Sequence, residues 1–348
     1  MPRLPRLLLF AAAIAALLTG VLSGLSRLGL STPAAMPIEN HGAFMVGGVF
    51  GTLISLERAV AMARPWPYLA PLFAAIGIIG LWLGLPPALA PWPFVAASVV
   101  LLVSSLRLCM QQKVLHLFAL AVASAMWLYG NLLWLDQGFV APAVPAWQSF
   151  LILTIAGERL ELSRFLNTPV RARRLFALLM ALQVIGVVSE SIWPLLFPLS
   201  LLGLAAWLLR YDIVRRTLRQ SGLPRYIAVC IGSGYLWLIA GALLQLCGQL
   251  GLTAPARDAA LHALLIGFVF AMVFGHAPIV LPAVAKLKFP YHPVLYAPLA
   301  LLHLTLALRF AASLLDYFPL RLWGALGNAA ALALFVLCVA TLLLRRKN

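Results

Sequence analysis

The chain has 348 residues, of which 64% are hydrophobic and only 10% are charged. A soluble globular protein carries roughly 25% charged residues, so this composition excludes a soluble enzyme and indicates a protein that crosses the membrane many times. The net charge of +16 would favour nucleic acid as a partner in a soluble chain, but here the basic residues lie at the ends of apolar runs. We therefore interpret the charge as a topology signal, with the lipid bilayer as the partner and no nucleic acid.

Apolar runs of the length that a membrane-spanning helix needs, about 20 residues, follow one another along the whole chain. They predict an all-α polytopic membrane protein with one integral membrane domain over residues 1–348. The first run has a basic tip like a signal peptide, but it is too long for one, so we interpret it as an uncleaved span. The predicted spans are 7–28, 37–62, 68–87, 91–109, 114–136, 144–165, 174–192, 194–213, 226–249, 258–283, 293–314 and 319–344.

The distribution of basic residues predicts the orientation of these twelve spans. If both termini are cytoplasmic, only Arg27, Arg257, Arg309 and Arg321 fall on the outer side, and the other 21 of the 25 basic residues fall on the inner side. Short cytoplasmic loops are enriched in Lys and Arg, so this alternation supports twelve spans in a bacterial inner membrane.

Short sequence patterns recur with a period of four spans. The second span ends with Leu-Glu-Arg at 56–58 and the sixth with Gly-Glu-Arg at 157–159, while the second and tenth spans both begin with a histidine and continue with glycine. The pattern suggests three pseudo-repeats of four helices, and the alternative is chance repetition of small apolar words.

Two histidines occupy matched positions in this topology. His41 lies about five residues into the second span and His262 about five residues into the tenth, and both spans run inward. Histidine is costly in a bilayer, and two imidazoles at one depth can ligate one haem iron from opposite faces. Asp258, one turn before His262, is placed to accept its outer ring N–H. We predict haem b at His41 and His262; the alternative is two interfacial histidines bonded to headgroups or loops.

A second metal or haem site is predicted from the remaining buried histidines. His276 follows His262 by 14 residues, which at 100° per residue places both on one face of a helix about 21 Å apart. His303, in the eleventh span, is expected at a similar depth to His276, and His116 is a weaker candidate. Copper is a possible occupant. The alternative is that these histidines bond backbone carbonyls, in the case of His276 a carbonyl released by Pro278 or Pro282.

Charged residues gather at the predicted inner ends of the second and sixth spans. Arginine–carboxylate pairs there would reduce the cost of placing charge in the membrane. We interpret them as structural ion pairs, with a proton entry point or a clamp for haem propionates as the functional alternative. The residues are Glu57, Arg58, Glu158, Arg159, Glu161 and Arg164.

With twelve spans and histidines on the second and tenth, the chain resembles the haem-copper oxidase superfamily and, more closely, its diverged NnrS-type relatives. Those families arrange twelve spans in three arcs of four and hold a low-spin haem between these two histidines. The stretch Phe274-Gly275-His276-Ala277-Pro278 is similar to the copper-ligand stretch of the oxidases but lies on another span. The resemblance implies haem binding, copper binding as an option, a redox partner protein, and a role in electron transfer or nitric oxide metabolism.

The chain also departs from the oxidases. The sixth span has no histidine and the chain has no adjacent His-His pair, so the resemblance does not imply an oxygen reductase. The sequence assigns no catalytic residue. Two other functions stay open: a secondary transporter with its substrate site at helices broken by Pro278, Pro282 and Pro298, and an assembly factor of a respiratory enzyme.

Overall fold

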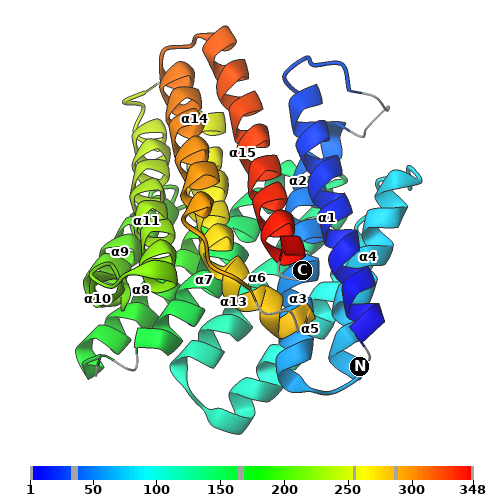
Figure 1. Ribbon diagram of the computed structural model, residues 1–348, viewed down its shortest axis with the longest axis vertical. Coiled ribbons are helices and arrows are strands. Elements are labelled where there is room, and N and C mark those ends of the chain that lie inside the picture. The colour runs from blue at the N-terminus through cyan, green and yellow to red at the C-terminus, as the bar shows by residue number, and fades with distance from the viewer. Residues whose placement is uncertain are drawn as a thin grey trace. The chain divides into compact units, whose positions relative to one another are not determined.

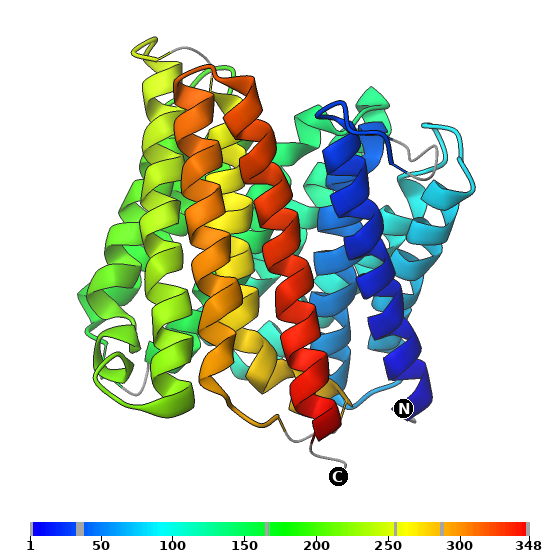
Figure 2. The same cartoon turned by 45° about the horizontal axis from the view of Figure 1, so that its top comes forward.

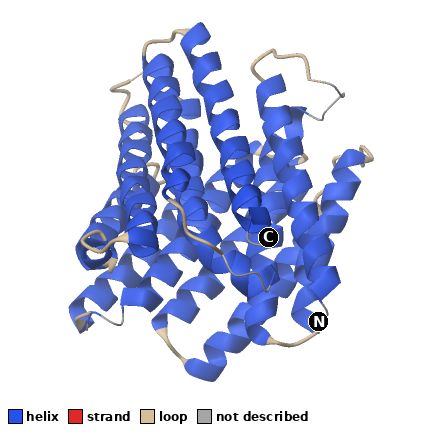
Figure 3. Cartoon of the chain, in the orientation of Figure 1, coloured by secondary structure: helices blue, strands red, loops and turns tan. Residues whose placement is uncertain are grey.

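The structure is a computed structural model that describes residues 3–32, 38–163, 166, 168–253, 256–285 and 289–345. Within these residues the chain is helical apart from short connections, and they contain no β-strand (Figure 3). The all-α class predicted from the apolar runs is therefore confirmed. One predicted site residue, Arg164, lies outside the described residues.

The contacts divide the chain into two compact units. The first unit is Met1–Thr154 with Pro282–Lys286, and the second is Ile155–Leu281 with Leu287–Asn348. The helices that begin in the first unit are α1 (Arg3–Ser26), η1 (Ile38–Asn40), α2 (His41–Ala43), η2 (Phe44–Gly51), α3 (Thr52–Met62), η3 (Trp66–Tyr68), α4 (Leu69–Trp82), α5 (Trp92–Gln112), α6 (Leu115–Gln137), η4 (Ala141–Ala143) and α7 (Val144–Ser163).

The second unit starts within α7 and continues to the C-terminus. Its helices α14 and α15 lie side by side in both ribbon views, where they are drawn in orange and red (Figures 1 and 2). Its helices are α8 (Val170–Val188), α9 (Leu196–Tyr211), α10 (Val214–Thr217), α11 (Gly222–Gln249), α12 (Arg257–His262), η6 (Ala263–Phe270), α13 (Ala271–Ala285), η7 (Pro293–Leu295), α14 (Tyr296–Leu314) and α15 (Phe318–Arg345).

Each of the twelve predicted apolar segments contains a helix in the structure. Eight helical stretches among the described residues are long and apolar enough to cross a membrane, and Trp66–Trp82 and Leu196–Tyr211 are shorter apolar helices. One predicted boundary is wrong: the segment expected to reach residue 87 ends as a helix at Trp82. Gly84 has a φ of +68°, and Pro86 and Pro87 follow, so the chain leaves the helix there.

Two helices contain π-helical segments, a feature that the sequence did not predict. The first, η2, begins three residues after His41, and the second, η6, begins directly after His262. In such a segment the backbone N–H bonds to a carbonyl five residues back, and π-helical turns occur frequently at functional sites. Each unit thus contains a histidine with a π-helical stretch that begins within three residues of it.

Glycines in these segments allow close packing against tryptophan. A Cβ atom added to Gly51 of η2 would overlap the Trp127 indole of α6, and one added to Gly267 of η6 would overlap Trp237 of α11. Small residues at helix contacts let the backbones approach closely in a membrane protein. Trp127 also stacks on Phe150 of α7, with ring centroids 5.1 Å apart. The two π-helical segments therefore lie in tightly packed surroundings.

Candidate functional site

His41 is the first residue of α2, and its ring is held by α1. The Nδ1 atom lies 2.6 Å from the carbonyl oxygen of Gly20. A Cβ atom added to Gly24, one turn further along α1, would lie 2.8 Å from Cε1 of His41, so glycine leaves the space that the ring fills. Because a carbonyl oxygen only accepts, Nδ1 carries the proton and Nε2 the lone pair.

His262 ends α12 in the second unit and has a similar environment at Nδ1. This atom lies 2.8 Å from the backbone carbonyl oxygen of Asp258 and 3.2 Å from the side-chain Oδ1 of the same residue. Both neighbours are acceptors, so Nδ1–H is the donor, and in the neutral ring Nε2 carries the lone pair. The prediction that Asp258 accepts the ring N–H of His262 agrees with these distances.

Asp258 is in turn bound by Arg309 of α14. The guanidinium donates from Nε to Oδ2 at 3.0 Å and from Nη2 to Oδ1 at 2.8 Å. The hydrogen bonds of such a bidentate ion pair are shorter and stronger than those between neutral groups, and they fix the orientation of both side chains. His262, Asp258 and Arg309 therefore form a chain of contacts between α12 and α14 within the second unit.

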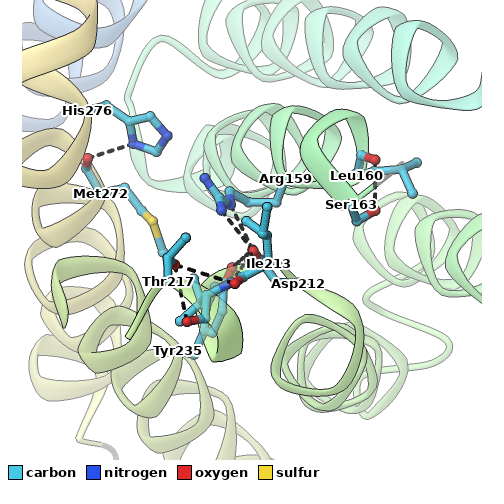
Figure 4. A network of polar contacts seen from close by, with 10 residues as sticks. Arg159, Leu160, Ser163, Asp212, Ile213, Thr217, Tyr235, Met272 and His276 are labelled. Carbon is cyan, nitrogen blue, oxygen red and sulfur yellow. Dashed lines mark hydrogen bonds and ion pairs between the residues drawn. The ribbon is translucent and has the colours of Figure 1, made fainter. Parts of the chain in front are cut away.

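His276 of α13 repeats the arrangement of the other two histidines. Its Nδ1 atom lies 2.7 Å from the carbonyl oxygen of Met272, one turn earlier in the same helix (Figure 4). This places the proton on Nδ1 and the lone pair on Nε2. The alternative prediction was a bond from His276 to a carbonyl released by Pro278 or Pro282. The observed acceptor is a backbone carbonyl, but it belongs to Met272, whereas these prolines would release the carbonyls of residues 274 and 278.

His303 of α14 has the opposite tautomer. The indole Nε1–H of Trp237 donates to its Nδ1 at 3.0 Å, so Nδ1 carries the lone pair and the protonated Nε2 donates to Oγ of Ser233 at 2.8 Å. Both ring nitrogens are thus used in contacts with α11. Ligation of a metal by His303 would require one of these hydrogen bonds to break.

The second predicted metal site, at His276 and His303 with His116 as a weaker candidate, stays a prediction. Among the residues that the structure describes, no three His, Cys, Asp or Glu side chains are grouped so as to hold a metal ion. His276, His303 and His116 therefore do not form such a group. The reasoning that put His262 and His276 on one face also fails, because it assumed 100° per residue and the intervening η6 is π-helical.

A second charged cluster in the second unit surrounds Asp212, a residue that was not among the predicted site residues. Arg159 of α7 donates from Nε to Oδ2 of Asp212 at 2.7 Å and from Nη2 to Oδ1 at 2.8 Å (Figure 4). Oδ2 also accepts the hydroxyl of Tyr235 from α11, and Oδ1 accepts the backbone N–H of Val214 at 3.0 Å. Arg159 and Asp212 are both buried.

This network joins three parts of the second unit: α7, the corner between α9 and α10, and α11. Every acceptor position of the Asp212 carboxylate is used, which is what a buried charge requires if it is not to destabilise the fold. The predicted structural role of Arg159 is therefore consistent with its contacts, and its partner is Asp212. Glu57, Glu158 and Glu161 each have an interaction partner, whereas Arg164 lies outside the described residues.

The residues that the sequence analysis missed carried a recognisable signal. Asp212 and Arg309 are charged and lie in or beside apolar runs, where a charge needs a partner of opposite sign. Arg309 and Asp258 were both assigned to the outer ends of their spans, so their pairing could have been expected. Ser233 and Trp237 share one helix at a spacing of four residues, which directs both toward His303.

The chain was also compared with known protein families and structures. A family model described as a domain of unknown function, DUF8744, matches residues 6–344. No curated protein and no solved structure matches the chain. Because the match extends over nearly the whole sequence, the chain belongs to the DUF8744 family.

Proposed function

We propose that this protein is a haem-binding protein of the bacterial inner membrane with twelve spans and cytoplasmic termini. The eight long apolar helices support a membrane location, and the uneven distribution of basic residues supports the orientation. The short or charged helices α4, α7, α8 and α9 supply the remaining four spans in this proposal, and the four-span pseudo-repeats belong to it as well.

The proposed ligands of the haem are His41 and His262. The observation that carries the proposal is that each residue donates its Nδ1–H to a carbonyl oxygen, so that in the neutral ring Nε2 is the nitrogen with the lone pair. Metal-binding histidines typically have their other nitrogen bonded to a carbonyl or carboxylate in this way. The two residues belong to different units, and each fits the role in its own surroundings.

Such a haem would supply one-electron chemistry. Held by His41 and His262, the haem would carry electrons and would not bind a substrate at its iron. A role in electron transfer or in nitric oxide and nitrogen oxide metabolism, with copper as an optional second metal and a redox protein as partner, follows from the resemblance to NnrS-type proteins.

The proposal is tested by measuring haem in purified protein. We expect the pyridine haemochrome assay to give haem b in the wild type and to show its loss in His41→Ala and in His262→Ala. His292→Ala is the matched control, because His292 lies before η7 and accepts the N–H of Val294. Unchanged haem content in both ligand variants would refute the assignment, and metal analysis of the same samples tests for copper.

A secondary transporter is the second candidate, and the two π-helical segments favour it. Transporters often place their substrate site where spanning helices depart from regular α geometry. This function predicts a purified protein with no Soret band whose thermal stability rises with one member of a panel of small molecules. A protein that contains haem and responds to none of them would exclude this candidate.

A further inference from the structure

The strongest candidate for an additional functional element is the contact chain His262, Asp258 and Arg309. Asp258 lies at the start of α12, His262 one turn later, and Arg309 on the neighbouring helix α14. The carboxylate lies between the other two groups, with its two oxygens 2.8 and 3.0 Å from the guanidinium and Oδ1 3.2 Å from Nδ1 of His262. The side chain of Asp258 is about one third exposed, whereas that of Arg309 is buried.

Arg309 is fixed in place by the helices around it. A Cβ atom added to Gly324 of α15 would lie 2.6 Å from Cβ of Arg309, so α15 packs directly on the arginine backbone. An apolar cluster formed by Leu244, Ala259 and Ala260, with Phe310 packed against it, lies beside the pair. The packing therefore fixes the position of the Arg309 side chain. Ion pairs exposed on a protein surface usually contribute little to stability, because their side chains are mobile and solvated.

We propose that Asp258 and Arg309 are positioning residues that prepare His262 to bind a metal centre. Arg309 holds the Asp258 carboxyl in place through two hydrogen bonds and so keeps one of its oxygens beside Nδ1–H of His262. The carboxylate shares the Nδ1–H of His262 with the backbone carbonyl of Asp258, at 3.2 and 2.8 Å. Its negative charge helps to fix the ring orientation and makes Nε2 a stronger electron donor. The inference rests on the proposed haem function for the identity of the metal centre, but not for the orientation of His262.

The first measurement uses haem affinity. We expect Asp258→Asn and Arg309→Gln to bind haem about 10- to 100-fold more weakly than the wild type, the usual effect of removing a group that orients a metal ligand. Asp212→Asn is the matched control, because it breaks the other two-pronged arginine–aspartate pair of the same unit without touching His262. Equal haem affinity of the two test variants and the wild type would overturn the proposal.

The second measurement needs no haem. The chain has six histidines, so selective labelling with ¹⁵N-histidine gives few resonances, and His262→Ala identifies the one of interest. In haem-free protein we expect the Nδ1 proton of His262 to move upfield in Asp258→Asn and Arg309→Gln, and not in Asp212→Asn. If the wild type binds no haem, the proposed function fails while this shift still tests the positioning role; an unchanged resonance in both test variants refutes that role.

Discussion

Replacing Asp212 by asparagine is expected to lower the free energy of unfolding of this protein by about 3–5 kcal/mol, because Arg159 is then left as a buried charge without its counter-charge. Both residues are buried, and two hydrogen bonds of 2.7 and 2.8 Å join them. Arg159→Gln is expected to cost a similar amount, since it leaves the carboxylate unpaired. Tyr235→Phe removes only one hydrogen bond to the carboxylate and should cost about 1.5–3 kcal/mol. Thermal unfolding in detergent measures all three variants.

Two controls separate the loss of the pair from a general effect of substitution. Arg210→Gln removes an arginine whose guanidinium lies over the Tyr211 ring at 5.3 Å, and it should change stability by no more than about 0.5 kcal/mol. The double variant Arg159→Met/Asp212→Leu removes both charges and should recover much of the loss. A double variant as unstable as the single ones would show that the network contributes more than charge compensation.

Alanine at either π-helical glycine, Gly51→Ala or Gly267→Ala, is expected to destabilise the protein by about 1–3 kcal/mol through overpacking. The added methyl group would overlap Trp127 in the first case and Trp237 in the second. Trp237 donates to His303, so its displacement should also break that hydrogen bond. Thermal unfolding measures the stability, and the emission spectrum of tryptophan reports the change around the indole rings.

Gly248→Ala is the matched control for this prediction. Gly248 lies near the end of α11, and a Cβ atom added there has no neighbour within 4 Å. Alanine is a better helix former than glycine by roughly 0.5–1 kcal/mol, so this variant should be unchanged or slightly more stable. If all three alanine variants behave alike, the packing of the π-helical segments on tryptophan does not limit the choice of residue there.

Much of the fold could be predicted from the sequence, because in a membrane protein the length and hydrophobicity of a run nearly determine that it is a helix. Most helix boundaries were predicted only to within about four residues: α8, for example, was expected at 174–192 and lies at Val170–Val188. The segment that ends at Trp82 differs more. The π-helical segments could not be predicted. Phe44–Gly51 and Ala263–Phe270 have the composition of any apolar span. Their residue types do not indicate whether a backbone N–H bonds to the carbonyl five residues back, as in a π-helix, or four residues back, as in an α-helix.

The candidate site was predictable only in part, because the decisive contacts join residues far apart in the chain. His262 and Asp258 are one turn apart, so their contact followed from helical spacing. Arg309 is 51 residues from Asp258, and Asp212 is 53 residues from Arg159. Pairing at such separations depends on which helices pack together, and a single sequence does not specify this. The tautomer of His303 likewise depends on Trp237, which lies on another helix.

The π-helical segments also affect how this family can change in length. A turn closed by a bond to the fifth residue holds one residue more than a regular α-helical turn. Deletion of one residue within Phe44–Gly51 or Ala263–Phe270 can therefore be absorbed by a return to regular bonding, without turning the remainder of the span. A regular α-helical part of a spanning helix cannot absorb a deletion in this way, and it cannot form a loop instead because lipid-exposed backbone must stay hydrogen-bonded. Within the described helices, we therefore expect these two stretches to tolerate the deletion of one residue better than the regular α-helical segments do.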